Sequence, residues 1–186
     1  MACFIHKTTK FLEQLAAKNI LVYQAMSLYY KKLIREEIAL ADIKSTDRIL
    51  CIGGGPCPFS GILLHEYTGA HVTIVDNDYC CVCIARQLIS KLGYTESIEV
   101  LYGDGNDISP KDYTVIHMAV QVNPIQQVFC SLKRKCPYGA RILVRVPKKG
   151  LKKFYSADDF SLFRNCCKKA VHNWRNIDST ALFIVA

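Results

Sequence analysis

The feature that most constrains the fold is an alternation of short β-branched runs and helical stretches that begins after residue 46. Runs rich in Val, Ile and aromatic residues predict strands at 48–52, 71–75, 97–102, 113–118 and 140–146. Between them, apolar residues recur at helical spacing, with helices expected to begin at Pro58, about Tyr79, Pro124 and after Ser156. Such alternation is typical of a parallel sheet with crossover helices, so the sequence predicts an α/β fold.

The N-terminal part of the chain has a different pattern. In residues 1–46 the apolar side chains recur at helical spacing and no strand signal is present. Asn19 is expected to interrupt this helical segment, because Asn favours helix ends. We therefore expect a short helical arm over 1–46, packed on the same domain as the sheet.

The C-terminal part predicts an antiparallel hairpin. Two apolar runs, 171–177 and 180–185, flank Asp178 and Ser179, which favour a tight turn. Residues 47–186 are thus expected to form one three-layer domain with a mostly parallel sheet and a terminal hairpin.

Composition limits the class of protein. A chain of 186 residues with 51% hydrophobic and 22% charged residues has enough apolar side chains for one globular core. No apolar run reaches the roughly 18 residues that span a bilayer. The first residues lack the order of a secretory signal, so we expect a cytoplasmic protein whose 10 cysteines stay reduced.

The net charge of +8 allows an anionic partner such as RNA. A basic tract at 148–153 follows the fifth predicted strand. However, the chain shows no RNA-binding motif with interleaved aromatic residues, and charged loops are usually solvated. RNA is therefore an allowed but less favoured partner, a membrane is not expected, and a homo-oligomer is left open.

A glycine-rich turn follows the first predicted strand, in the segment Gly53-Gly54-Gly55-Pro56. Glycine lets the backbone turn sharply and approach a ligand closely, and the next helix begins with unpaired amides. In an open α/β sheet, ligands bind at the carboxyl ends of the strands. This turn is therefore a candidate for holding a ligand.

Acidic residues follow the next two strands. Asp76, beside Asn77, ends the second strand and can accept both hydroxyls of a ribose, and Asp104, beside Gly105, follows the third and can accept an adenine amine. Together with the glycine turn these residues predict an adenosine-binding site. A nicotinamide dinucleotide is less favoured, because Pro58 stands where its fingerprint has a glycine.

The segment 47–186 resembles the class I S-adenosylmethionine-dependent methyltransferases, through Gly53-x-Gly55, Asp76 and Gly103-Asp104. More narrowly, 53–60, 75–78 and 139–145, followed by 150–155, are similar to nicotianamine synthase. The resemblance implies a Rossmann-like methyltransferase fold and S-adenosylmethionine as cofactor. The chain departs from these families at Cys51 and Cys57, where the methyltransferase motif has an acid and a glycine, and its arm is shorter than the synthase's N-terminal domain.

The resemblance leads us to expect a transferase that uses S-adenosylmethionine. Methyl transfer to a small-molecule acceptor is the first expectation, and aminocarboxypropyl transfer, as in nicotianamine synthase, is the alternative. A third hypothesis is an RNA- or partner-binding module that keeps the fold without catalysis. The expected cofactor-binding residues are Gly53, Gly54, Gly55, Pro56, Asp76, Asn77, Asp104 and Gly105.

The sequence gives few signals for the residues that would bind the acceptor. Tyr23, Tyr30 and Glu36 in the arm are candidate pocket residues, although tyrosines at helical spacing more often pack. No catalytic base stands out in the sequence. His117 lies within the fourth predicted strand, where a hydrogen-bonded core histidine is the more common interpretation than proton transfer.

The spacing of the cysteines gives little indication of a metal site. Cys80 and Cys83 lie on one helical face, near Cys57 if the first two strands are neighbours. The paired Cys-x-x-Cys knuckles of a structural zinc site are missing, so no metal is expected and packing is the favoured role.

Overall fold

The computed structural model describes residues 13, 17, 19–151, 160–172 and 176–186. The strands are β1 Arg48–Ile52, β2 His71–Asp76, β3 Ile98–Tyr102, β4 Val115–Met118, β5 Arg141–Pro147, β6 Lys168–Val171 and β7 Ile177–Ile184. The helices are α2 Ile20–Ala41, α3 Phe59–Thr68, α4 Tyr79–Leu92 and α5 Ile125–Lys135, with short 3-10 helices η1 Lys149–Leu151 and η2 Phe160–Arg164.

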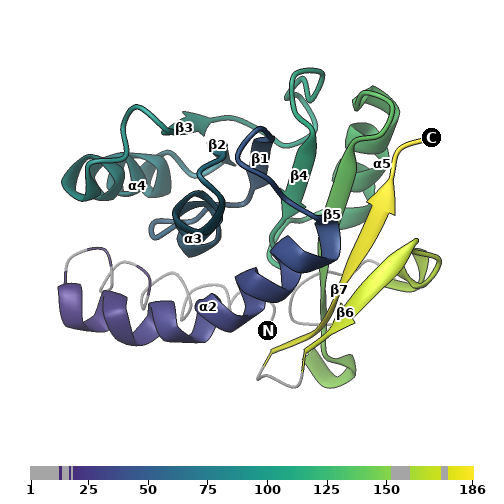
Figure 1. The fold of residues 1–186 in the computed structure, drawn as a ribbon, viewed down its shortest axis with the longest axis horizontal. Coiled ribbons are helices and arrows are strands. Elements are labelled where there is room, and N and C mark those ends of the chain that lie inside the picture. The colour runs from purple at the N-terminus through teal and green to yellow at the C-terminus, as the bar shows by residue number, and fades with distance from the viewer. Residues whose placement is uncertain (1–12, 14–16, 18, 152–159, 173–175) are drawn as a thin grey trace.

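The strands form one seven-stranded sheet in the order β3-β2-β1-β4-β5-β7-β6. Strands β1 to β5 are parallel, while β7 is antiparallel to β5 and β6 is antiparallel to β7. The carboxyl ends of the parallel strands therefore meet at one edge (Figure 1). This confirms the expected Rossmann-like methyltransferase fold with its terminal hairpin.

Two apolar clusters cover the two faces of the sheet. The first contains buried residues of α2, α3 and α4, such as Ile34, Ile62 and Val82. The second packs α5 and η2 against the other face, through residues such as Phe129 and Phe160. In Figure 1, α2 and α3 run side by side on one side of the sheet, and α5 lies on the other.

Local signals account for the end of α3 and for both ends of α4. Gly69 and Gly93 adopt left-handed backbone conformations, with φ of 74° and 77°, and close α3 and α4. The Asp78 side chain accepts hydrogen bonds from the backbone N–H groups of Cys80 and Cys81 at the start of α4. These caps depend only on neighbouring residues, so the residues that form them can be recognised in the sequence.

The described residues of the arm are mostly helical. Residues 13 and 17 are helical, Asn19 is not, and α2 follows from Ile20. The Asn19 side chain accepts a hydrogen bond from the backbone N–H of Val22 at 3.4 Å, next to the start of α2. No helix in the described part of the chain is long and apolar enough to cross a membrane.

Two predictions for the C-terminal third, the turn at 178–179 and the helix after Ser156, have different outcomes. The turn predicted at Asp178 and Ser179 is wrong, because both residues belong to β7. Ser179 is paired on one side with Val146 of β5 and on the other with Val171 of β6, so pairing with both neighbours outweighs the local turn preference. Most of the helix expected after Ser156 lies outside the described residues, and 160–164 form the 3-10 helix η2.

Candidate functional site

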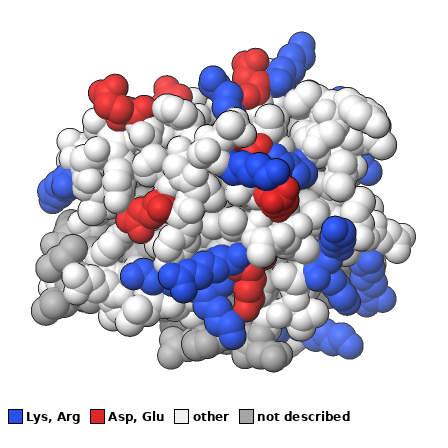
Figure 2. All heavy atoms as spheres, viewed as in Figure 1, with Lys and Arg blue, Asp and Glu red and all other residues white. Residues whose placement is uncertain are grey.

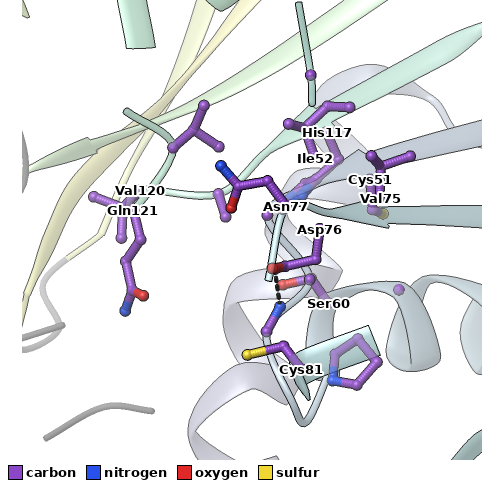
Figure 3. A pocket seen from close by; sticks show the side chains of 18 of the residues that line it. Cys51, Ile52, Ser60, Val75, Asp76, Asn77, Cys81, His117, Val120 and Gln121 are labelled. Atoms are coloured by element: carbon purple, nitrogen blue, oxygen red, sulfur yellow. Dashed lines mark hydrogen bonds between the residues drawn. The ribbon is translucent and has the colours of Figure 1, made fainter. Parts of the chain in front are cut away.

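A cavity of about 620 Å³ lies at the carboxyl edge of the sheet, where the loops after β1, β2, β3 and β4 meet (Figure 3). Its volume is in the range of ligand sites, which is about 300–1,000 Å³. All of the residues expected to bind a cofactor line it: Gly53, Gly54, Gly55, Pro56, Asp76, Asn77, Asp104 and Gly105. The structure thus brings the residues that the sequence singles out into one cavity.

The glycine turn after β1 packs tightly against β2. The backbone N–H of Gly53 donates to the carbonyl oxygen of Val75 at 2.9 Å. A Cβ added at Gly54 would stand 2.3 Å from the Ile74 Cγ2, which leaves no room for a side chain. Gly55 has a φ of 66°, a conformation that favours glycine. The turn therefore presents bare backbone to the cavity.

Asp76 joins the glycine turn to the loop after β2. Its Oδ2 accepts a hydrogen bond from the backbone N–H of Gly55 at 2.7 Å, drawn as a dashed line in Figure 3. Its Oδ1 accepts from the backbone N–H of Asp78 at 2.9 Å. Each carboxylate oxygen has a second lone pair, so these bonds orient Asp76 and leave acceptor capacity for a diol.

The loop after β3 orients a second acid. Both the backbone N–H and the side-chain amide of Asn106 donate to the Asp104 Oδ1, at 2.8 and 3.0 Å. Within the described residues the other oxygen of this exposed carboxylate has no hydrogen-bond donor. A Cβ added at Gly105 would stand 2.8 Å from the Ile52 Cγ2, so glycine lets this loop approach β1 closely.

Glu13, from the helical segment before Asn19, also lines the cavity. Its Oε2 lies 2.6 Å from where a Cβ of Gly55 would be. Burial, together with the neighbouring Asp76 carboxylate, raises the pKa of Glu13 to about 8. Sequence reasoning missed this residue, because nothing in the local pattern around Glu13 shows that the arm folds back onto the glycine turn.

A buried ion pair joins Glu37 of α2 to Arg145 of β5 at the cavity wall. Arg145 lines the cavity and donates to both oxygens of Glu37, from Nε at 2.8 Å and from Nη2 at 2.8 Å. Burial alone would raise the pKa of Glu37, but Arg145 and His117 outweigh it and hold this pKa well below its usual range. Glu37 is therefore ionised behind the cavity wall.

His117 is a hydrogen-bonded core histidine, as the favoured interpretation predicts. Its Nε2 lies 3.2 Å from the Glu37 Oε2, and the side chain is buried. Burial, and then the Arg145 charge, lowers the pKa of His117. The uncharged imidazole also borders the cavity, which the strand pattern does not indicate.

The three candidate residues for the acceptor, Tyr23, Tyr30 and Glu36, lie in different places in the structure. Tyr30 lines the cavity, whereas Tyr23 and Glu36 are not among the described residues around it. Tyr23 stacks on Phe59 with ring centroids 5.2 Å apart. Glu36 instead contacts His172, with 2.6 Å between its Oε2 and Nδ1. Helical spacing alone does not distinguish these faces of α2, because α2 contacts both α3 and the sheet.

Three cysteines, Cys51, Cys57 and Cys81, line the cavity, and all are buried. Burial, followed by the nearby Glu13 carboxyl, raises the pKa of the Cys57 thiol far above its usual value. Among the described residues no group of three His, Cys, Asp or Glu side chains is arranged to hold a metal ion. Burial of these three thiols fits a packing role. The prediction is wrong for Cys80, which is exposed, whereas Cys83 is half-buried.

Charged side chains are distributed unevenly on the face shown in Figure 2. Lys and Arg side chains are interspersed with Asp and Glu over α2, and they gather without acidic neighbours toward the lower right of the view.

No known protein-family model matches the chain. A curated relative, an L-histidine 2-aminobutanoyltransferase from Yersinia pestis, is 28% identical over 72 residues, which are 39% of this chain and 27% of that protein. The match thus spans about a quarter of the relative's length.

Solved structures match over more of the chain. MtNAS, a nicotianamine synthase, in complex with MTA and tNA is 23% identical, with a TM-score of 0.82, covering 100% of this chain and 75% of that one. A variant of MtNAS in complex with S-adenosylmethionine has the same TM-score, 0.82. An RNA methyltransferase from Salinibacter ruber, in complex with S-adenosyl-L-homocysteine, is 18% identical with a TM-score of 0.65, covering 83% of this chain and 90% of that one. At these identities the likeness shows the fold.

Proposed function

We propose that this chain is an S-adenosylmethionine-dependent transferase that moves the aminocarboxypropyl group of its cofactor to an amine of a small-molecule acceptor. The observation that carries the proposal is the meeting, in one cavity, of the adenosine-binding loops and the carboxyl group of Glu13. The loops suit the cofactor, and the carboxyl group suits an acceptor that must lose a proton.

The residues present fit the adenosyl part of the cofactor. The cradle made by Gly54 and Gly55 has no space for side chains and leaves the backbone open to a ligand. In our proposal Asp76 accepts the ribose hydroxyls and Asp104 accepts the adenine amine through its uncommitted oxygen. Gly53, Pro56, Asn77 and Gly105 complete this wall of the cavity.

When bound, the cofactor supplies a carbon made electrophilic by the adjacent sulfonium, so that an attacking amine displaces methylthioadenosine. The chain must orient the amine, exclude water and take up the proton that the amine loses. Glu13 suits the last role, since a base works best with a pKa near the working pH, and the pKa of Glu13 is about 8. Tyr30, also on the cavity wall, suits orientation of the acceptor.

Two comparisons support aminocarboxypropyl transfer over methyl transfer. The nicotianamine synthase fold superposes on the whole chain with a higher TM-score than the RNA methyltransferase, 0.82 against 0.65. The curated relative is named for the transfer of an aminobutanoyl group to L-histidine. Methyl transfer, the first expectation from sequence, is therefore our second candidate, and it uses the same cofactor site.

Product analysis tests the proposal. The purified protein is incubated with S-adenosylmethionine and L-histidine, or another amino acid or amine, and the adenosyl product is identified by mass spectrometry. We expect methylthioadenosine in an amount equal to the adduct formed. S-adenosylhomocysteine would instead support methyl transfer.

A control without acceptor removes the contribution of spontaneous cofactor breakdown. If the protein binds no S-adenosylmethionine, the transferase proposal is wrong, and titration with RNA at several salt concentrations then tests the binding-module hypothesis.

A further inference from the structure

Ser60, in the first turn of α3, presents a hydroxyl group whose proton has no acceptor in the described part of the chain. The side chain lines the cavity and its Oγ accepts a hydrogen bond from the Arg145 Nη1 at 2.9 Å. A guanidinium group can only donate, so this contact uses a lone pair of the oxygen and turns its proton away from Arg145. Ser60 is therefore a directed donor at the cavity wall.

Arg145 is held in place from behind by Glu37. The two parallel hydrogen bonds of 2.8 Å match the fork of the guanidinium to the carboxylate. Arg145 is 3% exposed and lines the cavity, whereas Glu37 is 0% exposed and is absent from the described lining. The positive end of this ion pair is thus the end that faces the cavity.

Each oxygen of the Glu37 carboxylate has two hydrogen-bonding contacts. Its Oε1 also accepts from the Thr180 hydroxyl at 2.7 Å, and its Oε2 also contacts the His117 Nε2 at 3.2 Å. Four contacts from β4, β5 and β7 prevent it from turning toward a ligand. Its role is therefore to fix the direction of Arg145, and through Arg145 that of Ser60.

The cavity wall carries both acceptors and donors. Asp76 and Asp104 place carboxylates on it, from the loops after β2 and β3. Ser60 and Arg145 place donors on it, from α3 and β5, and among the described residues three of the five N–H groups of Arg145 have partners. A ligand that carries both hydroxyls and an anionic group matches these side chains.

We propose that Ser60 and Arg145 bind the carboxylate of an α-amino acid group, and that Glu37 is the positioning residue that fixes them. This inference rests on the proposed function, because both the methionine part of S-adenosylmethionine and an amino acid acceptor carry such a carboxylate. A carboxylate suits the site because charge-assisted hydrogen bonds from a hydroxyl and a guanidinium group are among the strongest in proteins.

Binding calorimetry with two ligands tests the role of Ser60. S-adenosylmethionine and methylthioadenosine share the adenosyl part, but only the first has the amino acid group. We expect Ser60→Ala to weaken binding of S-adenosylmethionine roughly tenfold or more, the size of a hydrogen bond to a charged group, with methylthioadenosine unaffected. Ser60→Thr, which keeps the hydroxyl group, should bind both ligands like the unchanged protein.

The role of Glu37 is tested by the ratio of the two dissociation constants. Glu37→Gln removes the charge that holds Arg145 and should lower the preference for S-adenosylmethionine over methylthioadenosine several-fold. Thr180→Val is the matched control, since it removes another bond to Glu37 and leaves the Arg145 pair. The control should lower the melting temperature without changing the ratio. If Glu37→Gln weakens S-adenosylmethionine, methylthioadenosine and L-histidine equally, its role is structural and the inference is wrong.

A third arm identifies the source of the carboxylate. If Ser60→Ala leaves the ratio unchanged but weakens binding of L-histidine to the protein saturated with methylthioadenosine, the site takes the carboxylate of the acceptor. If neither changes, the carboxylate site is excluded while the transferase proposal stands. If the unchanged protein binds neither adenosyl ligand, the proposed function fails, and the carboxylate site fails with it.

Discussion

The carboxylate of Asp76, at the end of β2, accepts a hydrogen bond of 2.7 Å from the backbone N–H of Gly55, in the turn after β1. The acid and the turn are separate motifs in the sequence, but in the structure they hold each other. A change at either residue should therefore affect the geometry of both, and binding experiments at this contact report on the whole adenosine site.

Removing the Asp76 carboxylate should weaken cofactor binding. We expect Asp76→Ala to weaken binding of S-adenosylmethionine by about 1–3 kcal/mol, because it removes the acceptors that we propose for the ribose and the bond that holds the glycine turn. Calorimetry measures this change. Asp107→Ala is the control, since Asp107 is an exposed acid of the neighbouring loop outside the cavity lining. Equal affinity of both variants would contradict the role of Asp76.

A methyl group at Gly55 should weaken cofactor binding. The residue has a φ of 66°, and an added Cβ would come within 2.6 Å of the Glu13 carboxyl oxygen. Gly93→Ala is a matched control, because Gly93 has a φ of 77° and nothing within 4 Å of its Cβ position. Both variants carry about 1–2 kcal/mol of backbone strain, which thermal unfolding measures. Loss of binding in both variants would show that strain alone is responsible.

Glu13→Gln should lower the transfer rate by about 10²- to 10⁴-fold, the range for loss of a general base. The pKa of Glu13 is about 8, so kcat/KM should rise with pH and level off above that value. The variant should lose this rise while binding the cofactor normally. An unchanged pH profile in Glu13→Gln would assign the proton transfer to another group.

The same carboxyl group should make stability fall as pH rises. Burial and Asp76 raise the pKa of Glu13 from 4.5 to about 8, so between these values the folded protein holds a proton that the unfolded chain has lost. The contribution of Glu13 is therefore complete below about pH 4.5 and lost as pH rises through 8. Melting temperatures of the protein and of Glu13→Gln should agree near pH 5, and the variant should melt higher above pH 8. Parallel curves over this range would argue against a raised pKa.

The parts of the fold that sequence predicts are those with local causes. The bounds of β1 and the start of α4 at Tyr79 agree with expectation, because a β-branched run and a capping side chain act through neighbouring residues. The hairpin turn is misplaced for the opposite reason. Asp178 and Ser179 favour a turn locally, but hydrogen bonding to two neighbouring strands decides their conformation.

The candidate site also contains residues that the sequence predicts and residues that only tertiary contacts bring there. The glycine turn, Asp76 and Asp104 are visible in the sequence because each follows a strand, and the strand order places those ends together. Glu13 and Tyr30 come from the arm, whose docking depends on contacts far along the chain. Among these are the bonds between Glu37 and Arg145, which are 108 residues apart.

For this protein, then, the order of residues along the chain determined the layered sheet and the edge at which a ligand meets it, because strand propensity, caps and glycine turns act over a few residues. Only the folded chain decided which buried acid and which cation face the cavity. Those properties depend on burial and on charges brought together from distant segments, and burial is what raises the pKa of Glu13 and orients the Arg145 ion pair.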